Sequence, residues 1–141
     1  MGNRALLTFS TEPTAPAIYL HWNGGRASVL GFLKAARQLG ITADCNPSLS
    51  EEELRDALGN MIARRFFGVK FDEMHAYRAE FGEGMDSDNG VFLLNRELEI
   101  IDRLQAPPVD EIDAEKTHLI CEAVLEDQSR KQLERAQARG F

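Results

Sequence analysis

The chain has little cysteine and no long apolar run. Its two cysteines among 141 residues, Cys45 and Cys121, lie far apart and match no metal-ligand spacing. We therefore expect reduced thiols. No apolar run approaches the roughly 20 residues that a transmembrane helix needs, and no long apolar segment near the N-terminus indicates export. Together these absences predict a cytoplasmic protein that is not embedded in a membrane and holds no metal or other cofactor.

Positive charge is scarce in one part of the chain only. Residues 1–70 hold six acidic and eight basic side chains, residues 71–102 hold nine and two, and residues 103–141 hold eight and six. The formal net charge of −7 therefore arises within residues 71–102, which we call the acidic window. A concentrated negative field repels nucleic-acid phosphates and suits a basic protein surface or a cation. We expect no direct nucleic-acid binding through this window.

Short apolar segments predict four strands. Residues 4–9 and 17–22 can pair as a first hairpin across a turn-rich connection. Residues 91–94 form an apolar run after the turn signal Asp-Asn-Gly, and residues 98–101 follow as the second strand of another hairpin. Residues 69–71 look extended, and the pattern over residues 74–81 fits either a strand or a short helix.

Helical periodicity predicts three helices. Residues 26–39 carry one apolar face and end at a glycine, Gly40. Ser50 and Glu53 form a capping box that opens a second helix, which ends at Gly68. Asp110 is predicted to cap a long final helix that buries Ile112, Leu119, Ile120, Ala123 and Val124. We expect a single α+β domain over residues 1–141, in which two or three helices pack on a small, mainly antiparallel sheet. Residues 128–141 are expected to project as a polar helical tail.

A strand that runs through two glycines into a helix is a candidate anion-binding site. Adjacent glycines let backbone N–H groups point outward beside the positive end of a helix dipole. The site would consist of Asn23, Gly24, Gly25, Arg26 and Ser28. Its spacing is similar to the Ser-Gly-Gly-x-Asp-Ser loop of ATP-pyrophosphatases, with Ala27 in place of the aspartate. The alternative is a tight turn with a purely structural role.

The acidic window contains a second candidate pattern. Asp86 and Asp88, with Glu83, resemble the opening of a calcium loop because oxygen ligands two residues apart on a turn can converge on a cation. The rest of such a loop is missing, so a hairpin turn is the better interpretation.

Catalytic residues are not evident. His118 and Cys121 are three residues apart and would share a helix face, but no third orienting group accompanies them. His21, at a strand end, would lie near the glycine turn, and His75 lies in the acidic window. We interpret these histidines as structural and predict no catalytic residue.

Two motifs in order resemble a known family. The first motif is Tyr-Leu-His-Trp-Asn-Gly-Gly at residues 19–25, together with the helix after it. The second is Asp-Ser-Asp-Asn-Gly-Val-Phe at residues 86–92. A helix that ends in Phe-Phe-Gly at residues 66–68 lies between the two motifs. Over roughly residues 3–104 the chain resembles an uncharacterised family of small bacterial proteins of prophages, plasmids and integrative conjugative elements. The resemblance implies a mobile-element setting, in which small acidic proteins often block host defence.

The acidic window interleaves aromatic residues with acids, which suits a protein interface. We predict that the partner-binding residues are Asp72, Glu73, Tyr77, Glu80, Phe81, Glu83, Asp86 and Asp88. The alternative is that the aromatic residues are part of the core and the acids form their solvated face.

The favoured function is a non-enzymatic module that binds a basic, nucleic-acid-binding effector of host defence, as an anti-CRISPR or antirestriction inhibitor. The alternative function is a nucleotide- or phosphate-binding enzyme that uses the glycine turn. The C-terminal helix offers a surface for homo-oligomerisation.

Overall fold

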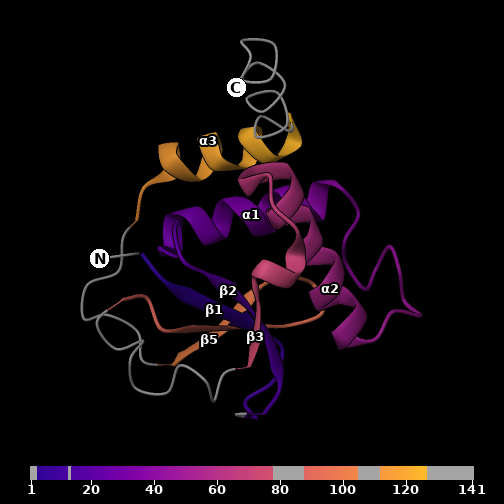
Figure 1. Ribbon diagram of the computed structural model, residues 1–141. Helices are drawn as coiled ribbons and strands as arrows, with labels where there is room; N and C mark the ends of the chain where they lie inside the picture. The colour runs from indigo at the N-terminus through magenta and orange to yellow at the C-terminus, as the bar shows by residue number, and fades with distance from the viewer. Residues whose placement is uncertain (1–2, 13, 78–87, 105–111, 127–141) are drawn as a thin grey trace, which may run out of the picture.

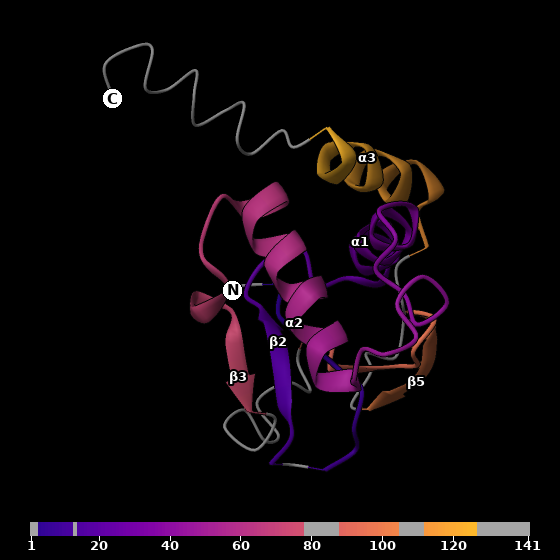
Figure 2. The ribbon, with the colours of Figure 1, turned by 90° about the vertical axis from the view of Figure 1, so that its right-hand side faces the viewer.

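The computed structural model of the chain describes residues 3–12, 14–77, 88–104 and 112–126. Within these ranges, a five-stranded mixed sheet has three α-helices on one side, which confirms the α+β class (Figure 1, Figure 2). The strands are β1 (Ala5–Thr8), β2 (Pro16–Leu20), β3 (His75–Tyr77), β4 (Val91–Leu94) and β5 (Ile100–Leu104). The helices are α1 (Arg26–Gln38), α2 (Glu51–Ile62) and α3 (Ala114–Leu125), with shorter turns η1 (Ala63–Phe67) and η2 (Phe71–Glu73). No helix in these ranges is both long and apolar enough to span a membrane.

The sheet has the strand order β3-β2-β1-β4-β5. β1 pairs antiparallel with β2 and parallel with β4, whereas the β2–β3 and β4–β5 pairings are antiparallel. Both predicted strand pairs, β1–β2 and β4–β5, are therefore confirmed. The central strands β1 and β4 are buried along their whole length.

The turn expected at residues 88–90 is present, but it does not close a hairpin between neighbouring strands. β2 and β1 separate β3 from β4, so these consecutive strands are not neighbours. The turn is instead held at the start of β1, where the Leu6 amide donates to the Gly90 carbonyl at 3.0 Å and the Asn89 amide donates to the Arg4 carbonyl at 3.1 Å. A parallel pairing joins segments far apart in the sequence, and a local turn signal carries no information about it.

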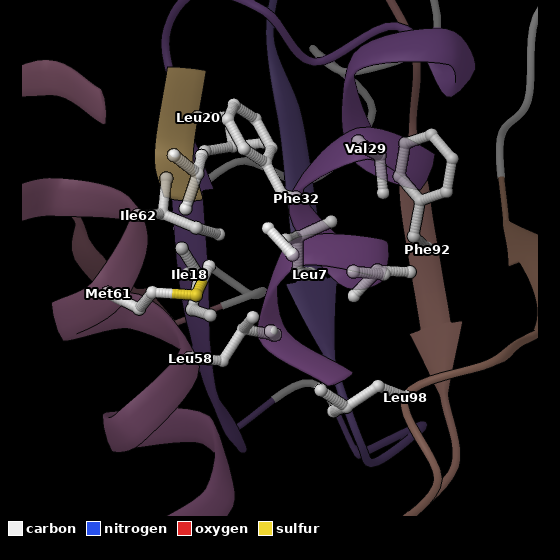
Figure 3. Close-up of a cluster of buried hydrophobic side chains, with 14 of the residues drawn as sticks. Leu7, Ile18, Leu20, Val29, Phe32, Leu58, Met61, Ile62, Phe92 and Leu98 are labelled. Carbon is white, nitrogen blue, oxygen red and sulfur yellow. The ribbon is translucent and has the colours of Figure 1, made fainter. Parts of the chain in front are cut away.

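One apolar core lies between the sheet and the helices α1 and α2. Phe32 of α1 and Leu58 and Ile62 of α2 are fully buried against it. Figure 3 shows these side chains converging with those of β1, β2 and β4; the labelled members are Leu7, Ile18, Leu20, Val29, Phe32, Leu58, Met61, Ile62, Phe92 and Leu98. A second, smaller cluster of Leu6, Ala17 and Val91 lies apart from this core.

Helix α2 begins and ends as predicted. The Ser50 hydroxyl accepts from the Glu53 amide at 3.1 Å, and the Glu53 carboxylate accepts from the Ser50 amide at 3.1 Å, which is the expected capping box. The helix then widens into the π-helical turn η1 and ends at Gly68, whose φ is +69°. The extended segment predicted over residues 69–71 is wrong for Phe71, which opens η2. A Cβ at Gly59 would lie 2.2 Å from the Phe71 ring, so this glycine lets the ring pack directly on α2.

Helix α3 starts later than predicted and packs on α1. Asp113, and not Asp110, is its N-cap, because the Asp113 carboxylate accepts from the Lys116 amide at 3.0 Å; Asp110 lies outside the described residues. Gly31 of α1 lets Ile120 approach, since a Cβ there would lie 2.7 Å from it. Ile112 and Leu119, which were predicted to be buried, are 82% and 59% exposed. The predicted tail over residues 128–141 also lies outside the described residues.

Candidate functional site

The glycine turn after β2 is anchored on the N-terminal segment. The Gly24 amide donates to the Asn3 carbonyl at 2.8 Å, and the Asn3 amide donates to the His21 carbonyl at 3.1 Å. A Cβ at Gly24 would lie 2.6 Å from that Asn3 oxygen and 2.8 Å from Ala5. Glycine is therefore required at residue 24 by the close approach of another backbone segment.

The residues of the predicted anion site do not form an open site in which all backbone N–H groups point outward. Gly24, Gly25 and Ser28 are buried, and the Gly24 amide is already bonded to Asn3. Gly25 is the N-cap of α1 and makes no side-chain cap bond. The Ser28 hydroxyl has no hydrogen-bond partner among the residues that the structure describes. Asn23 has a φ of +60°, and Arg26 is partly exposed. The arrangement accounts for a tight strand-to-helix turn, and binding of an anion there stays a prediction.

Asp88 forms an ion pair within the chain. Its carboxylate accepts from Nε of Arg4 in an ion pair, and its side chain is only 5% exposed. The hydrogen bond and the negative charge of Asp88 raise the pKa of the Arg4 guanidinium. This contact ties the turn before β4 to the start of β1, so Asp88 has a structural role that the sequence did not indicate.

The remaining predicted partner-binding residues are placed only in part. Asp72 is exposed on η2, Glu73 ends η2, and Tyr77 ends β3. Glu80, Phe81, Glu83 and Asp86 lie outside the described residues. Three further acids of the window, Glu97, Glu99 and Asp102, are exposed along the β4–β5 hairpin. Because β3 and β5 are opposite edges of the sheet, the exposed acids of the window that the structure describes lie towards two separate edges.

An aromatic cleft lies at the β3 side of the sheet. It has a volume of about 290 Å³ and is lined by Tyr19, His21, Trp22, Phe67, Val69 and Met74. We call it the Trp22 cleft. Trp22, the sole tryptophan of the chain, is 53% exposed, and Val69 is 36% exposed. Tryptophan is enriched among the residues that dominate the binding energy of protein interfaces, so the exposed Trp22 ring beside an apolar cleft makes this surface a candidate binding site.

The end of β2 and the turn η1 build this cleft. Tyr19 and His21 point to the same side because they are two residues apart on an extended chain, and the Tyr19 hydroxyl lies 2.9 Å from Nδ1 of His21 in a hydrogen bond. The His21 ring meets the Trp22 ring edge to face, with centroids 5.0 Å apart. On the opposite wall, Phe67 packs edge to face on Phe66 at 4.9 Å.

The π-helical turn explains how Phe67 reaches the cleft. Phe66 and Phe67 both pack against the core beside Phe32, with ring centroids 5.0 and 6.2 Å from its ring, and Phe67 also lines the cleft. The Val69 amide then donates to the Ala63 carbonyl at 2.9 Å, which closes the turn around Gly68. π-helical turns are rare and occur frequently at functional sites.

His118 and Cys121 do not form a pair. His118 is exposed, whereas Cys121 is 1% exposed, so the shared helix face that the spacing suggested is wrong. Burial raises the pKa of the Cys121 thiol. Within the described part of the chain, no three His, Cys, Asp or Glu side chains lie close enough to hold a metal ion.

The sequence pointed to the glycine turn and did not identify the cleft beside it. The sequence places Trp22 just before the tight turn but does not indicate that its ring is exposed. Phe67 and Val69 carry no signal either, because the folding of α2 brings them to the cleft. Comparison with protein-family models, with curated proteins and with solved structures finds no match to this chain.

Proposed function

We propose that this chain is a protein-interaction module without catalytic activity, which docks on a basic protein surface. The observation that carries the proposal is the half-exposed Trp22 at an apolar, aromatic cleft. A tryptophan that inserts into an interface contributes about 2 kcal/mol or more to binding. Asp72 lies in the segment between Val69 and Met74, which both line the cleft, and it opens the acidic window. Acids around an apolar anchor accelerate association with a basic partner.

The resemblance to mobile-element proteins suggests the class of partner. In that setting, the basic surface belongs to a nucleic-acid-binding effector of host defence, such as a CRISPR or restriction complex in the cytoplasm. An acidic protein that covers such a surface competes with nucleic-acid phosphates for the same charges. Inhibition by occupancy needs no chemistry from the inhibitor.

The alternative function, a nucleotide- or phosphate-binding enzyme at residues 23–28, has less support. The Gly24 amide, which would have to face the anion, donates to Asn3 instead. A nucleotide would therefore have to displace the N-terminal segment before it could reach this turn.

Affinity capture with matched variants tests the proposal. Tagged wild type, Trp22→Ala and Leu119→Ala are each incubated with lysate of a bacterial host, and the captured proteins are quantified by mass spectrometry. Leu119 is a suitable control because it is 59% exposed, close to the 53% of Trp22, but lies on α3. We expect a basic protein that wild type and Leu119→Ala retain and that Trp22→Ala loses. Equal capture by all three proteins would contradict the proposal.

A second pair of variants tests the role of charge. Asp72 and Asp102 are both exposed acids of the window, but they lie at opposite edges of the sheet. We expect Asp72→Lys to slow association with the captured partner and Asp102→Lys to leave it unchanged. Added salt should reduce the association rate of wild type, because it screens exposed charges. A rate that does not respond to salt would rule out steering by the acids.

A further inference from the structure

The surface around the Trp22 cleft carries both an exposed ring and a hollow beside it. Trp22 is 53% exposed and Val69 is 36% exposed, and both line the cleft. The cleft has a volume of about 290 Å³, and among the described residues no lysine, arginine or carboxylate lines it. A hollow of this size lies just below the range of about 300–1,000 Å³ that is typical of small-molecule pockets. It therefore suits a single apolar side chain better than a cofactor.

The described charges next to the cleft cancel in pairs. Arg4, which is hydrogen-bonded to the cleft residue Tyr19, forms an ion pair with Asp88. Lys70 and Asp72 are both exposed on the segment that leads from the η1 wall of the cleft to β3. Two copies of this surface would therefore bring together no excess of charge of one sign.

Such a surface is complementary to itself. In a two-fold symmetric dimer the same patch of both subunits is buried, so that each contact between two different groups is made twice. A ring beside a hollow meets this requirement, because Trp22 of each copy can enter the cleft of the other. A base and an acid on one segment meet it too, because Lys70 of each copy can face Asp72 of the other.

We infer that the Trp22 cleft is the interface of a symmetric dimer, in which each copy inserts Trp22 into the cleft of the other and sets Lys70 opposite Asp72. This interface differs from the surface of the C-terminal helix, which the sequence offered for homo-oligomerisation. The inference goes beyond the proposed function, because it gives the same surface an occupant in the absence of a partner. The dimer covers Trp22, so dimerisation and partner binding exclude each other.

Sedimentation equilibrium of the purified full-length chain tests the inference, together with the fluorescence of Trp22, the sole tryptophan. We expect twice the mass of one chain at high protein concentration and the mass of one chain after dilution. The emission of Trp22 should shift to longer wavelength over the same dilution, because its ring returns to water. A chain that stays monomeric at millimolar concentration, or a dimer whose dissociation leaves the emission unchanged, would overturn the inference.

Two variants localise the interface. Trp22→Ala should raise the dissociation constant of the dimer at least thirty-fold, the ratio that a loss of about 2 kcal/mol gives. Leu119→Ala, on α3, should dissociate at the same concentration as wild type. The amide spectrum of each variant shows whether it is folded. A dimer that Leu119→Ala disrupts and Trp22→Ala retains would overturn the inference in favour of α3.

Exchange of charge tests the second contact without a change in the core, because Lys70 and Asp72 are both exposed. Lys70→Glu leaves two acids on the segment, and Asp72→Lys leaves two bases. We expect each variant alone to dimerise about five-fold more weakly than wild type, because like charges then face each other twice in the dimer. An equimolar mixture of the two variants should form the mixed dimer in preference, which native mass spectrometry identifies by its mass. A mixture that is no more dimeric than its components would overturn the symmetric dimer.

The failure of this inference and the failure of the proposed function give different results. A monomeric wild type would overturn the dimer and leave the proposed function intact, because capture of a partner needs Trp22 but no second copy. Equal capture by wild type and Trp22→Ala would contradict the proposed function. A dimer that Trp22→Ala disrupts would still support the inference in that case.

Discussion

The two halves of the segment 19–25 differ in what they contact. Gly24 and Gly25 are buried, and Gly24 lies against the backbone of Asn3. Trp22, two residues earlier, is half-exposed at the aromatic cleft. Neighbouring residues of one motif therefore have different roles. The glycines allow the chain to turn into α1, and the turn holds Trp22 at the surface.

This difference shows that the residues of the 19–25 motif do not all belong to one binding site. Anion binding is the familiar function of a strand–glycine–helix turn, but here the amide of Gly24 is committed to the fold. The side chain that precedes the glycines is the part that remains available to a partner. Substitutions in the two halves should therefore separate stability from binding.

The largest expected effect is on stability at Gly24. In Gly24→Ala, the new Cβ would lie 2.6 Å from the Asn3 oxygen, so the N-terminal segment must move. We expect the free energy of unfolding to fall by about 3 kcal/mol, as measured by urea denaturation. Gly40→Ala is the control: its φ is +80°, but the nearest atom, Cys45 Sγ, is 3.9 Å away. Backbone strain alone should cost about 1–2 kcal/mol there. Equal losses in the two variants would contradict the packing argument.

The second-largest expected effect is on the affinity for the partner when Trp22 is replaced. Trp22→Ala should weaken binding of the captured partner by about 2 kcal/mol but lower the free energy of unfolding by less than about 1 kcal/mol, because much of the ring is already in water. Isothermal titration and urea denaturation of the same preparation measure the two quantities. A large loss of stability would show that Trp22 belongs to the core, and the comparison between the two halves would then fail.

Asp88 and Asp72 extend the contrast to charged residues. Asp88→Asn removes the ion pair with Arg4, so we expect a lower Tm and unchanged association with the partner. Asp72→Asn removes an exposed acid, so we expect an unchanged Tm and slower association. Thermal unfolding and stopped-flow association measure both. The reverse pattern would place Asp88 in the interface and contradict its structural role.

The smallest effects concern the two thiols. Cys121 is buried with a raised pKa, whereas Cys45 is exposed. A raised pKa means that the folded state holds the thiol proton more tightly than the unfolded state does. The stability from this group is therefore complete below about pH 8.5, the ordinary thiol pKa, and declines as the pH rises above it. Urea denaturation across alkaline pH checks this decline, and Cys121→Ser should reduce it.

Alkylation gives an independent check on the same pair. Iodoacetamide should modify Cys45 in the folded protein and leave Cys121 largely unmodified, because the reactive thiolate of Cys121 is both buried and disfavoured. Peptide mapping by mass spectrometry measures the two rates. Similar rates would indicate that α3 separates readily from α1.

Local features of the fold were predictable from the sequence. The capping box at Ser50, the glycine stops at Gly40 and Gly68 and the apolar run of β4 each act within a few residues, and the structure confirms them. The start of α3 was misplaced because Asp110 and Asp113 both precede the same helical pattern and either could cap it. The α+β class followed from the order of these elements.

Features that depend on distant contacts were not predictable. The parallel pairing of β4 with β1 and the ion pair of Asp88 with Arg4 join segments more than 80 residues apart in the sequence. The Trp22 cleft needs the π-helical turn to carry Phe67 to the end of β2, and no periodicity reveals such a turn. Neither the exposure of Trp22 nor its surroundings were predicted from the sequence.

The affinity of the Trp22→Ala variant for the captured partner tests the central claim most directly. The measurement is isothermal titration of purified partner into wild type and into the variant, with Leu119→Ala as the control. Our account predicts at least tenfold weaker binding by Trp22→Ala and wild-type affinity for Leu119→Ala, which corresponds to a loss of about 1.4 kcal/mol or more. Wild-type affinity in Trp22→Ala would contradict it, because the cleft would then be no part of the interface.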